Sequence, residues 1–572
     1  MRLLSLRLDG QYKGLRDQTF DFSHANSNVI AFIGLNGSGK SQLLELIAET
    51  FSYLERYLRR DFKHRNWFDG TGLELNYSNQ EYNSEDTIHL YKVIIDQSGS
   101  IQITKNGTLI DPSNQDVLNI DKILPSQIIG YSSGLNENLQ RAFMKNAVQY
   151  LDVMNAKRAW EMRLVAIKKN WDEKGKQLTE DDLELYDSQI SEAYAYYQNR
   201  YPGIFSELPK NVNVIENPEL GSRATPLPRL KYIDHDTTAL LLTSLGIVKD
   251  GDKKANWIKK QRFSKVHSVI IKYDLRKFTH DVGALLDIVK LINCVGGINS
   301  NNFSTSSNSK KTSEDFFNQF ELDYLVGEIT INFTEKGIQE ALSDAFFEPA
   351  FLFEKLYRLQ LLGAEFWPID MKRQLRQDKF QGSIKKPQKW ASPIKITSLK
   401  LTTDISCIEF DDLSDGEAQL IQVLAMTAIY NNQRALYLLD EPETHLNPSW
   451  RTYFHTYLDE VINSDSSNDK FQLLTSTHSP FMISSLKRNN VYYFRRDQDG
   501  LIGMSTPQNE TYGASFDVLI KDLFELRSLI SQTVVEEIRS QIKHGDLHAR
   551  KWIEENLGLS AERAYLIKKL GQ

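Results

Sequence analysis

A glycine-rich segment near the start of the chain has the spacing of a phosphate-binding loop. Gly34–Ser41 has the sequence GLNGSGKS and fits the pattern G-x-x-x-x-G-K-[ST]. Glycines allow backbone N–H groups to close around phosphate oxygens, and a following helix adds the positive end of its dipole. In this pattern Lys40 reaches the β- and γ-phosphates and Ser41 ligates Mg²⁺. The alternative is a plain glycine turn before a helix. The predicted nucleotide-binding residues here are Gly34, Asn36, Gly37, Ser38, Gly39, Lys40, Ser41 and Gln42.

Two acidic residues far along the chain have the chemistry that such a loop needs beside it. Asp440 and Glu441 directly follow the apolar run Leu436–Leu439. Asp440 would orient Mg²⁺ through a coordinated water, and Glu441 would accept a proton from the attacking water. An apolar strand that ends in Asp-Glu is common, so this pair alone does not separate a catalytic site from a solvated turn.

A third and a fourth segment add candidate γ-phosphate ligands. The segment Ser414–Glu417 opens an amphipathic helix. Ser414 is either the N-cap of this helix or, together with the Gly416 N–H group, a ligand for the γ-phosphate of a second nucleotide. Glu417 belongs to the same candidate site. His478 follows a predicted strand and is either a structural histidine or a sensor of the γ-phosphate.

The residue pattern around these segments predicts an α/β fold. Val29–Ile33 is apolar throughout, which indicates a buried central strand, and the spacing of Leu43, Leu46 and Ile47 predicts a helix after the loop. Strand, glycine-rich loop and helix are the context that a phosphate-binding loop requires. Two more buried strands are expected over Leu436–Leu439 and Phe471–Thr475.

At 572 residues the chain is too long for one compact core, so several structural units are expected. Residues 1–140 form the N-terminal lobe of the predicted head, and 141–390 a large, mainly helical insertion. Residues 391–505 form the C-terminal lobe, which holds Ser414, Asp440, Glu441 and His478. Residues 506–572 form a helical tail, interpreted as a partner-binding region.

Composition limits the classes of partner. The net charge of −7 argues against a surface that is basic all over, so nucleic acid would need a local patch. The segment Lys372–Lys389 is the best candidate, although a solvated basic loop explains it equally well. Two cysteines exclude a disulfide scaffold. The N-terminal residues do not have the pattern of a signal peptide, and the apolar runs are too short to span a membrane, so a cytoplasmic location is expected.

The ordered set GLNGSGKS, LSDGE, LYLLDEPETHLNP and STHSP resembles the ABC-type ATPases of the SMC and RecF branch. In that family two heads enclose two ATP molecules, so the resemblance implies ATP and Mg²⁺ as cofactors and a head-to-head dimer or higher oligomer. It implies catalytic roles for Lys40, Ser414, Glu441 and His478, and metal binding by Ser41 and Asp440. It assigns Gly34–Ser41 as Walker A, Ser414–Glu417 as the signature, Asp440 and Glu441 as Walker B, Glu443–Pro448 as the D-loop and His478 as the switch histidine.

Two departures from the family pattern leave questions open. The signature is LSDGE where the family has LSGGQ, so Asp415 places a carboxylate near a phosphate site. The Q-loop glutamine has no obvious position. The segment Tyr131–Glu137 is the predicted lid, but Gln127 precedes it and Gln140 follows it.

The lid segment, the LSDGE signature, the long intervening stretch and the helical tail together resemble a narrower group. This is the PtuA group, the ATPase subunits of Septu-type and retron-associated anti-phage systems. The resemblance implies an HNH nuclease of the PtuB type as partner, and in retron versions a reverse transcriptase with its RNA–DNA product. Two alternatives remain: a DNA-repair or chromosome-associated ATPase that acts directly on DNA, and an ATP-bound structural switch with little turnover.

Overall fold

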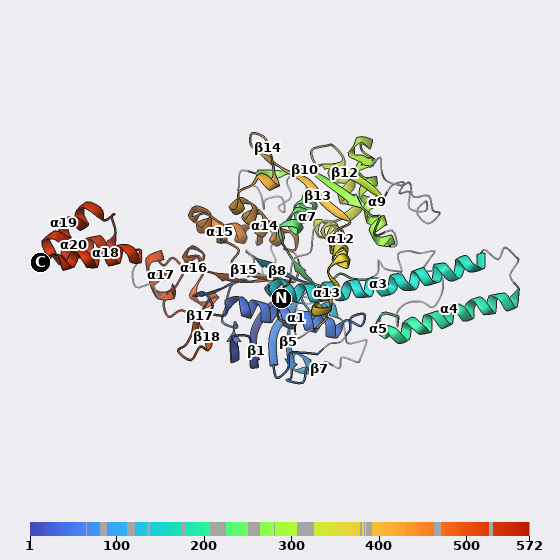
Figure 1. The fold of residues 1–572 in the computed structure, drawn as a ribbon, viewed down its shortest axis with the longest axis horizontal. Coiled ribbons are helices and arrows are strands. Elements are labelled where there is room, and N and C mark those ends of the chain that lie inside the picture. Colours follow the sequence, from blue (N-terminus) through green and yellow to red (C-terminus); the bar gives the residue numbers. More distant parts are fainter. Residues whose placement is uncertain are drawn as a thin grey trace.

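The computed structural model describes residues 1–63, 66–80, 88–110, 120–133, 138–172, 179–205, 225–249, 263–278, 281–305, 325–377, 380–382, 384, 392–431, 433–462, 471–524 and 530–570. Figure 1 shows a body of sheets and helices from which a helical hairpin and the C-terminal helices extend at opposite ends. No helix in the described part of the chain is both long and apolar enough to cross a lipid bilayer.

Seven of the described strands form the central sheet, in the order β18-β17-β3-β16-β15-β8-β9. The strands from β17 to β9 run parallel, and β18 pairs antiparallel at the edge. Every residue of β3, β15 and β16 is buried, as expected for parallel strands covered on both faces. The strands are β3 (Val29–Gly34), β8 (Gln127–Ser132), β9 (Leu230–Tyr232), β15 (Ala435–Asp440), β16 (Gln472–Thr477), β17 (Val491–Arg496) and β18 (Ile502–Ser505).

A second, antiparallel sheet belongs to the N-terminal lobe and has the order β2-β1-β4-β5-β6-β7. Helix α1 (Lys40–Leu58) is buried over most of its length and packs against β3, β15, β16 and, through Phe51 and Tyr77, against β4. The strands are β1 (Arg2–Tyr12), β2 (Leu15–Asp21), β4 (Gly72–Gln80), β5 (Ile88–Ile95), β6 (Ile101–Lys105) and β7 (Thr108–Ile110), and the short helix α2 (Ile120–Ile123) precedes β8.

A third sheet, in the order β11-β12-β10-β13-β14, joins the insertion to the C-terminal lobe. Its strands are β10 (Phe263–Asp274), β11 (Phe303–Thr305), β12 (Val326–Asn332), β13 (Ile394–Thr403) and β14 (Cys407–Glu409). The helices around it are α7 (His235–Leu245), α9 (Val282–Gly296), α11 (Ile338–Phe346), α12 (Pro349–Leu362) and α13 (Ile369–Leu375), with 3₁₀ turns η4 (Ser300–Asn302) and η5 (Gly363–Phe366). Helix α14 (Asp415–Ile429) follows β14 through the 3₁₀ turn η7 (Phe410–Asp412), so this sheet positions the start of α14.

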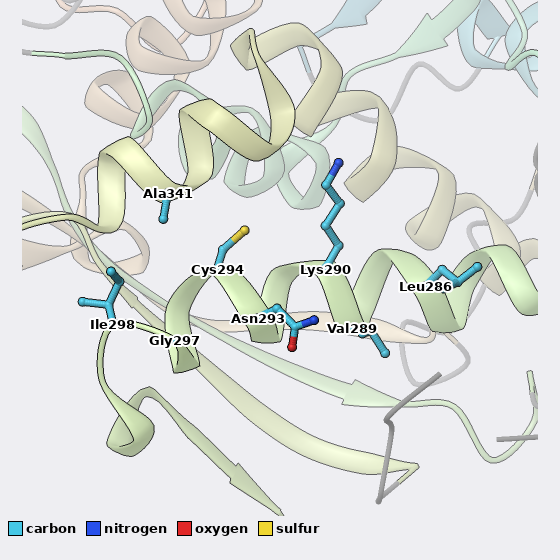
Figure 2. A pocket seen from close by; sticks show the side chains of 8 residues that line it. All are labelled: Leu286, Val289, Lys290, Asn293, Cys294, Gly297, Ile298 and Ala341. Carbon is cyan, nitrogen blue, oxygen red and sulfur yellow. The ribbon is translucent and has the colours of Figure 1, made fainter. Parts of the chain in front are cut away.

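A wide groove of about 610 Å³ lies between α9 and α11 (Figure 2). Lys290 and Cys294 of α9 point into it, and Ala341 faces them from α11. Among the described residues that line the groove, Lys290 alone is charged. Because one lysine is a poor match for the several charges of a nucleoside triphosphate, this groove is not the predicted nucleotide site.

The helices α3 (Asn138–Asp172) and α4 (Glu180–Arg200) form a long hairpin that projects from the body (Figure 1), and the short α5 (Pro202–Phe205) follows them. Trp160 of α3 is buried against the rings of Tyr194 and Tyr197 of α4. At the base of the hairpin, Arg158 pairs with Glu365 at 2.9 Å. Aromatic packing therefore joins the two helices, and an ion pair ties the hairpin to the 3₁₀ turn η5.

The C-terminal lobe continues through α15 (Pro448–Ile462), α16 (Pro480–Ser484), η8 (Arg488–Asn490) and α17 (Phe516–Phe524) to the tail helices α18 (Gln532–Lys543), α19 (Asp546–Asn556) and α20 (Ala561–Leu570). Helix α17 packs against α16 and β3. The tail helices pack on one another around Ile538, Ala549 and Ile553, and they extend away from the body (Figure 1).

The predicted α/β head with a mainly helical insertion and a helical tail is confirmed. The insertion also contributes strands: β9 extends the central sheet, and β10 and β12 pair in the third sheet. Because β10 pairs with β13, the expected boundary at residue 390 is crossed by backbone hydrogen bonds. The unit boundaries at 140, 390 and 505 stay predictions.

The aromatic contacts of the α3–α4 hairpin lead to a test of its stability. We expect Trp160→Ala to lower the free energy of local opening of the hairpin by about 3 kcal/mol, since it removes a large buried side chain. Amide hydrogen exchange across residues 180–200 should become faster. Met162→Ala, on the same helix but 60% exposed, is the control and should change the opening free energy by less than about 0.5 kcal/mol. Equal exchange in both variants would contradict the packing role.

Candidate nucleotide-binding site

The predicted phosphate-binding loop follows β3 directly and ends where α1 begins. Gly34 and Gly39 are needed for its course: their φ angles are 152° and 99°. A Cβ on Gly34 would lie 2.2 Å from the Phe494 carbonyl oxygen, and one on Gly39 would lie 2.7 Å from Ile502. These two glycines therefore let the loop pass close under β17 and β18, at the N-terminus of α1.

A cavity of about 290 Å³ opens beside this loop. Glu441 and His478 line the cavity together with the predicted phosphate-binding residues. Four further lining residues were not predicted from the sequence. Its lining consists of Lys13, Asn36, Gly37, Ser38, Gly39, Lys40, Ser41, Gln42, Glu45, Asn138, Leu139, Glu441 and His478. Polar and charged side chains dominate this list, as binding of a triphosphate requires.

Ser41 and Asp440, the predicted magnesium ligands, lie in contact. The Ser41 hydroxyl donates to Asp440 Oδ1 at 2.8 Å, and the Ser476 hydroxyl donates to the same carboxylate oxygen. Among the described residues no group of three or more His, Cys, Asp or Glu side chains is placed to hold a metal by itself. One carboxylate and one hydroxyl fit Mg²⁺, which takes few protein ligands and completes its shell with phosphate oxygens and water.

Glu441 has an unusual backbone conformation, with φ at 52°. A non-glycine residue in this region costs of order 1–3 kcal/mol and is held there by its surroundings. The Glu441 N–H donates to the Ser476 hydroxyl at 3.1 Å. His478 Nε2 lies 3.3 Å from Glu441 Oε1, and this hydrogen bond holds the pKa of Glu441 below its usual value, against partial burial. Glu441 is therefore an ionised carboxylate that lines the cavity.

His478 Nε2 also lies 3.1 Å from Lys40 Nζ. One ring nitrogen either accepts a hydrogen bond from the ammonium or donates one to Glu441, so it cannot serve both at once. Lys40 also donates to the carbonyl oxygens of Gly34 and Leu35. Burial lowers the pKa of Lys40 to about 8, opposed by nearby carboxylates. A bound phosphate would offer Lys40 a better acceptor and free His478 for Glu441.

A buried charge network borders the cavity. Lys13 Nζ lies 2.8 Å from one Glu45 oxygen, and Arg141 contacts both Glu45 and Glu49. Lys145 pairs with Glu49 at 2.9 Å. Three bases and two acids thus meet in this network beside the pocket. Lys13 lies in the turn between β1 and β2 with φ at 53°, and no motif in the sequence marks it.

Ser414 is the N-cap of α14, and its hydroxyl and the Glu417 carboxylate form a capping box. Ser414, Gly416 and Glu417 do not line the cavity of their own chain. Gly416 has a packing role, since a Cβ there would lie 2.8 Å from the His445 carbonyl oxygen. Ser414 is therefore a helix cap in this protomer. Its role as a ligand for a second nucleotide stays a prediction.

Neither glutamine considered for the Q-loop lies at the cavity. Gln127 begins β8 and donates to Glu354 at 3.2 Å, whereas Ser133 lies beyond the other end of that strand. Gln140 is buried in α3. Residues 134–137 of the predicted lid lie outside the described residues.

The basic segment Lys372–Lys389 is described in part. Lys372 donates to the Glu365 carbonyl oxygen of η5, and Arg376 pairs with Asp152 of α3 at 2.6 Å, so Arg376 contributes to packing against the hairpin. Lys379, Lys385, Lys386 and Lys389 lie outside the described residues. Nucleic-acid binding by this segment stays a prediction.

Glu443, beneath the site, generates a pH-dependent prediction. The Thr477 hydroxyl donates to one of its oxygens, and burial raises its pKa from 4.5 to about 7. Because the folded pKa exceeds the unfolded one, ionisation of Glu443 costs stability as the pH rises from 4.5 to about 7. Glu443→Gln removes this cost. We expect the thermal midpoint of the variant, relative to the unmodified protein, to rise between about pH 5 and about pH 8. A difference that does not change with pH would contradict this account.

Three known proteins illustrate the similarity found by comparison. Protein ea59 of Escherichia phage lambda is 25% identical over 133 residues, which cover 22% of this chain and 24% of that protein. The chain thus spans about a quarter of the length of this curated relative. The Smc head domain with a coiled coil and joint from Pyrococcus yayanosii has a TM-score of 0.32 at 14% identity, covering 92% of this chain and 100% of that one. The recombination mediator protein RecF has a TM-score of 0.30 at 15% identity, covering 88% and 97%. Scores this low support no inference about this chain.

A family match is far more extensive. The family described as AAA ATPase domain matches residues 1–483. This range takes in the loop that ends at Ser41, the acidic pair Asp440 and Glu441, and His478, which the structure gathers around one cavity. With more than half of its length matched, this chain belongs to the AAA ATPase domain family.

Proposed function

We propose that ATP binds in the cavity beside Gly34–Ser41 and is hydrolysed there by water that Glu441 activates. One observation carries the proposal: Lys40, Glu441 and His478 come from the ends of three neighbouring strands and line one cavity. Each has the chemistry that transfer of a phosphoryl group to water needs.

Each side chain at the cavity has a separate role in the proposed reaction. The loop amides and Lys40 hold the β- and γ-phosphates and offset their negative charge. Glu441 accepts the proton of the attacking water, and His478, 3.3 Å from Glu441, holds that carboxylate at the phosphate side of the cavity. Ser41 and Asp440 would hold Mg²⁺, which supplies further neutralisation of phosphate charge. The positive φ of Glu441 turns its carboxylate toward the cavity.

We further propose that two heads complete one another's sites. Ser414 and Gly416 start a helix whose N-terminus is suited to bind a phosphate, yet they do not line the cavity of their own chain. In a head-to-head dimer they would reach the nucleotide of the second copy. Asp415, exposed beside them, would weaken that contact by charge repulsion.

At the level of the cell, the preferred role is an ATPase subunit of an anti-phage defence complex of the Septu or retron type. In this role ATP-dependent dimerisation of the heads regulates a separate HNH nuclease of the PtuB type, with a reverse transcriptase and its RNA–DNA product in retron versions. The motif set and the overall organisation support it. The tail helices offer a docking surface, since Leu547 is 85% and Leu559 92% exposed.

Each of the two alternative functions is supported by one specific observation. The basic segment Lys372–Lys389 favours a DNA-repair or chromosome-associated ATPase that acts directly on DNA. Gln127 and Gln140 both lie away from the cavity, which favours a structural switch in which ATP joins the protomers with little turnover. Affinity purification of the chain from its native cells separates the first two roles. Recovery of an HNH nuclease supports the defence complex, whereas recovery of DNA without a nuclease supports the alternative.

Loss of the general base leads to a prediction on turnover and assembly. Glu441→Gln should lower kcat about 100-fold or more, because the amide cannot take the proton from water. ATP binding should survive, so the variant should accumulate as an ATP-bound dimer, measured by phosphate release and light scattering. Adding Ser414→Arg to this variant should return it to a monomer that still binds ATP. A normal rate of hydrolysis in Glu441→Gln would refute the assignment of the base.

Lys40→Ala is the matched variant for nucleotide affinity. It should abolish ATP binding measured by calorimetry, because it removes the cation that faces the phosphates. Its circular dichroism spectrum should match that of the unmodified protein. Unchanged ATP affinity would place the nucleotide elsewhere.

A further inference from the structure

Thr444, in the loop after β15, lies directly on the carboxylate proposed as the base. Its hydroxyl lies 3.3 Å from Glu441 Oε2 and 3.0 Å from the Glu441 carbonyl oxygen. The other carboxylate oxygen, Oε1, lies 3.3 Å from His478 Nε2. Each carboxylate oxygen of Glu441 therefore has its own neighbour, a hydroxyl at Oε2 and an imidazole at Oε1.

Ser133 lies beside Thr444, and either of the two hydroxyls can donate to the other. The Ser133 hydroxyl lies 3.1 Å from the Thr444 hydroxyl, and the Ser133 N–H donates to the Asp440 carbonyl oxygen at 3.0 Å. A threonine hydroxyl donates once but accepts twice. If Ser133 donates to Thr444, the proton of Thr444 is left for Glu441. Ser133 is anchored on the backbone of Asp440, which keeps its hydroxyl beside that of Thr444.

Besides the contact of the Thr444 hydroxyl with the Glu441 carbonyl oxygen, three other contacts hold the loop at Thr444. Arg451 donates to the Thr444 carbonyl oxygen at 2.7 Å. The next residue, His445, donates its N–H to the buried side chain of Gln419 at 2.8 Å. Glu443, on the other side, is buried and accepts from Thr477. Removal of the Thr444 hydroxyl should therefore leave the course of the loop unchanged.

We propose that Thr444, oriented by Ser133, is a positioning residue for the Glu441 carboxylate. The hydroxyl at Oε2 and the imidazole at Oε1 fix the plane of the carboxylate. A carboxylate offers about four lone-pair sites, so a free one remains to accept the proton of water. Without Thr444 the carboxylate rotates, and fewer of its orientations are productive. This inference rests on the proposed role of Glu441 as the base.

Thr444→Val replaces the hydroxyl by a methyl group of the same shape. In the full-length chain we expect kcat for ATP hydrolysis to fall about ten-fold, which corresponds to the loss of one hydrogen bond to a charged group. KM for ATP, the affinity for ATP and the thermal midpoint should stay the same. Thr444→Ser keeps the hydroxyl and should recover most of the lost turnover. Ser133→Ala should lower kcat in the same direction by a smaller factor.

Thr452→Val is the matched control. This threonine lies on α15, and its hydroxyl donates to the Pro448 carbonyl oxygen, away from Glu441. It should leave kcat within about two-fold of the unmodified protein. An equal loss in both variants would mean that removing any hydroxyl here impairs the enzyme, which would overturn the proposal.

A double-variant comparison separates this inference from the proposed function. If Glu441→Gln is inactive, adding Thr444→Val should lower turnover no further, because the two residues act through one carboxylate. A full turnover rate in Thr444→Val beside an inactive Glu441→Gln would overturn the positioning role alone. Activity in Glu441→Gln would refute the base itself. If Thr444→Val lowers both the ATP affinity and the thermal midpoint, the hydroxyl stabilises the turn at Glu441. That result would also overturn the inference.

Discussion

The parallel pairing of β3, β15 and β16 is the constraint on which the nucleotide site depends. β16 lies between the other two, with Ser476 beside Phe32 on one side and beside Asp440 on the other. Parallel strands end at the same edge of a sheet, so Gly34, Asp440 and Thr477 leave it together. The residues that follow these three ends are the phosphate-binding loop, Glu441 and His478. A shift in register would separate them and turn their side chains to the other face.

Buried charges of opposite sign stabilise one another at this edge of the sheet. Burial removes much of the hydration of the Lys40 ammonium, and Asp440 and Glu441 stabilise its positive charge. Glu443, fully buried behind them, is kept largely neutral below about pH 7 by the same desolvation. Removal of one member leaves another charge in a low dielectric without a partner, which is costly. This arrangement of charges suits a negatively charged ligand that brings its own cation.

Two connections lead from this edge to the rest of the molecule. Gln419 of α14 binds both the Tyr131 hydroxyl at 3.0 Å and the His445 N–H, so the helix that begins near Ser414 is tied to the loop beside Glu441. Phe524, the last residue of α17, places its ring centre 6.4 Å from that of His478. The tail helices follow α17 in the chain. The nucleotide site is therefore linked by short series of contacts to the start of α14 and to the end of α17.

The local motifs were predictable from sequence because they depend on neighbouring residues. Gly34–Ser41 needs glycines at positions with positive φ, and an all-apolar run indicates a strand buried on both faces. The positions of Lys13, Ser133 and Thr444 could not be predicted, since each reaches the site through pairing between segments remote in sequence. The same holds for β9, whose three residues carry no strand signal of their own. The sequence by itself determined which chemical groups the protein has and the α/β elements that carry them. Only the tertiary structure decided which groups meet, because side-chain contacts across a sheet follow strand order and register, and these are set by packing of the whole core.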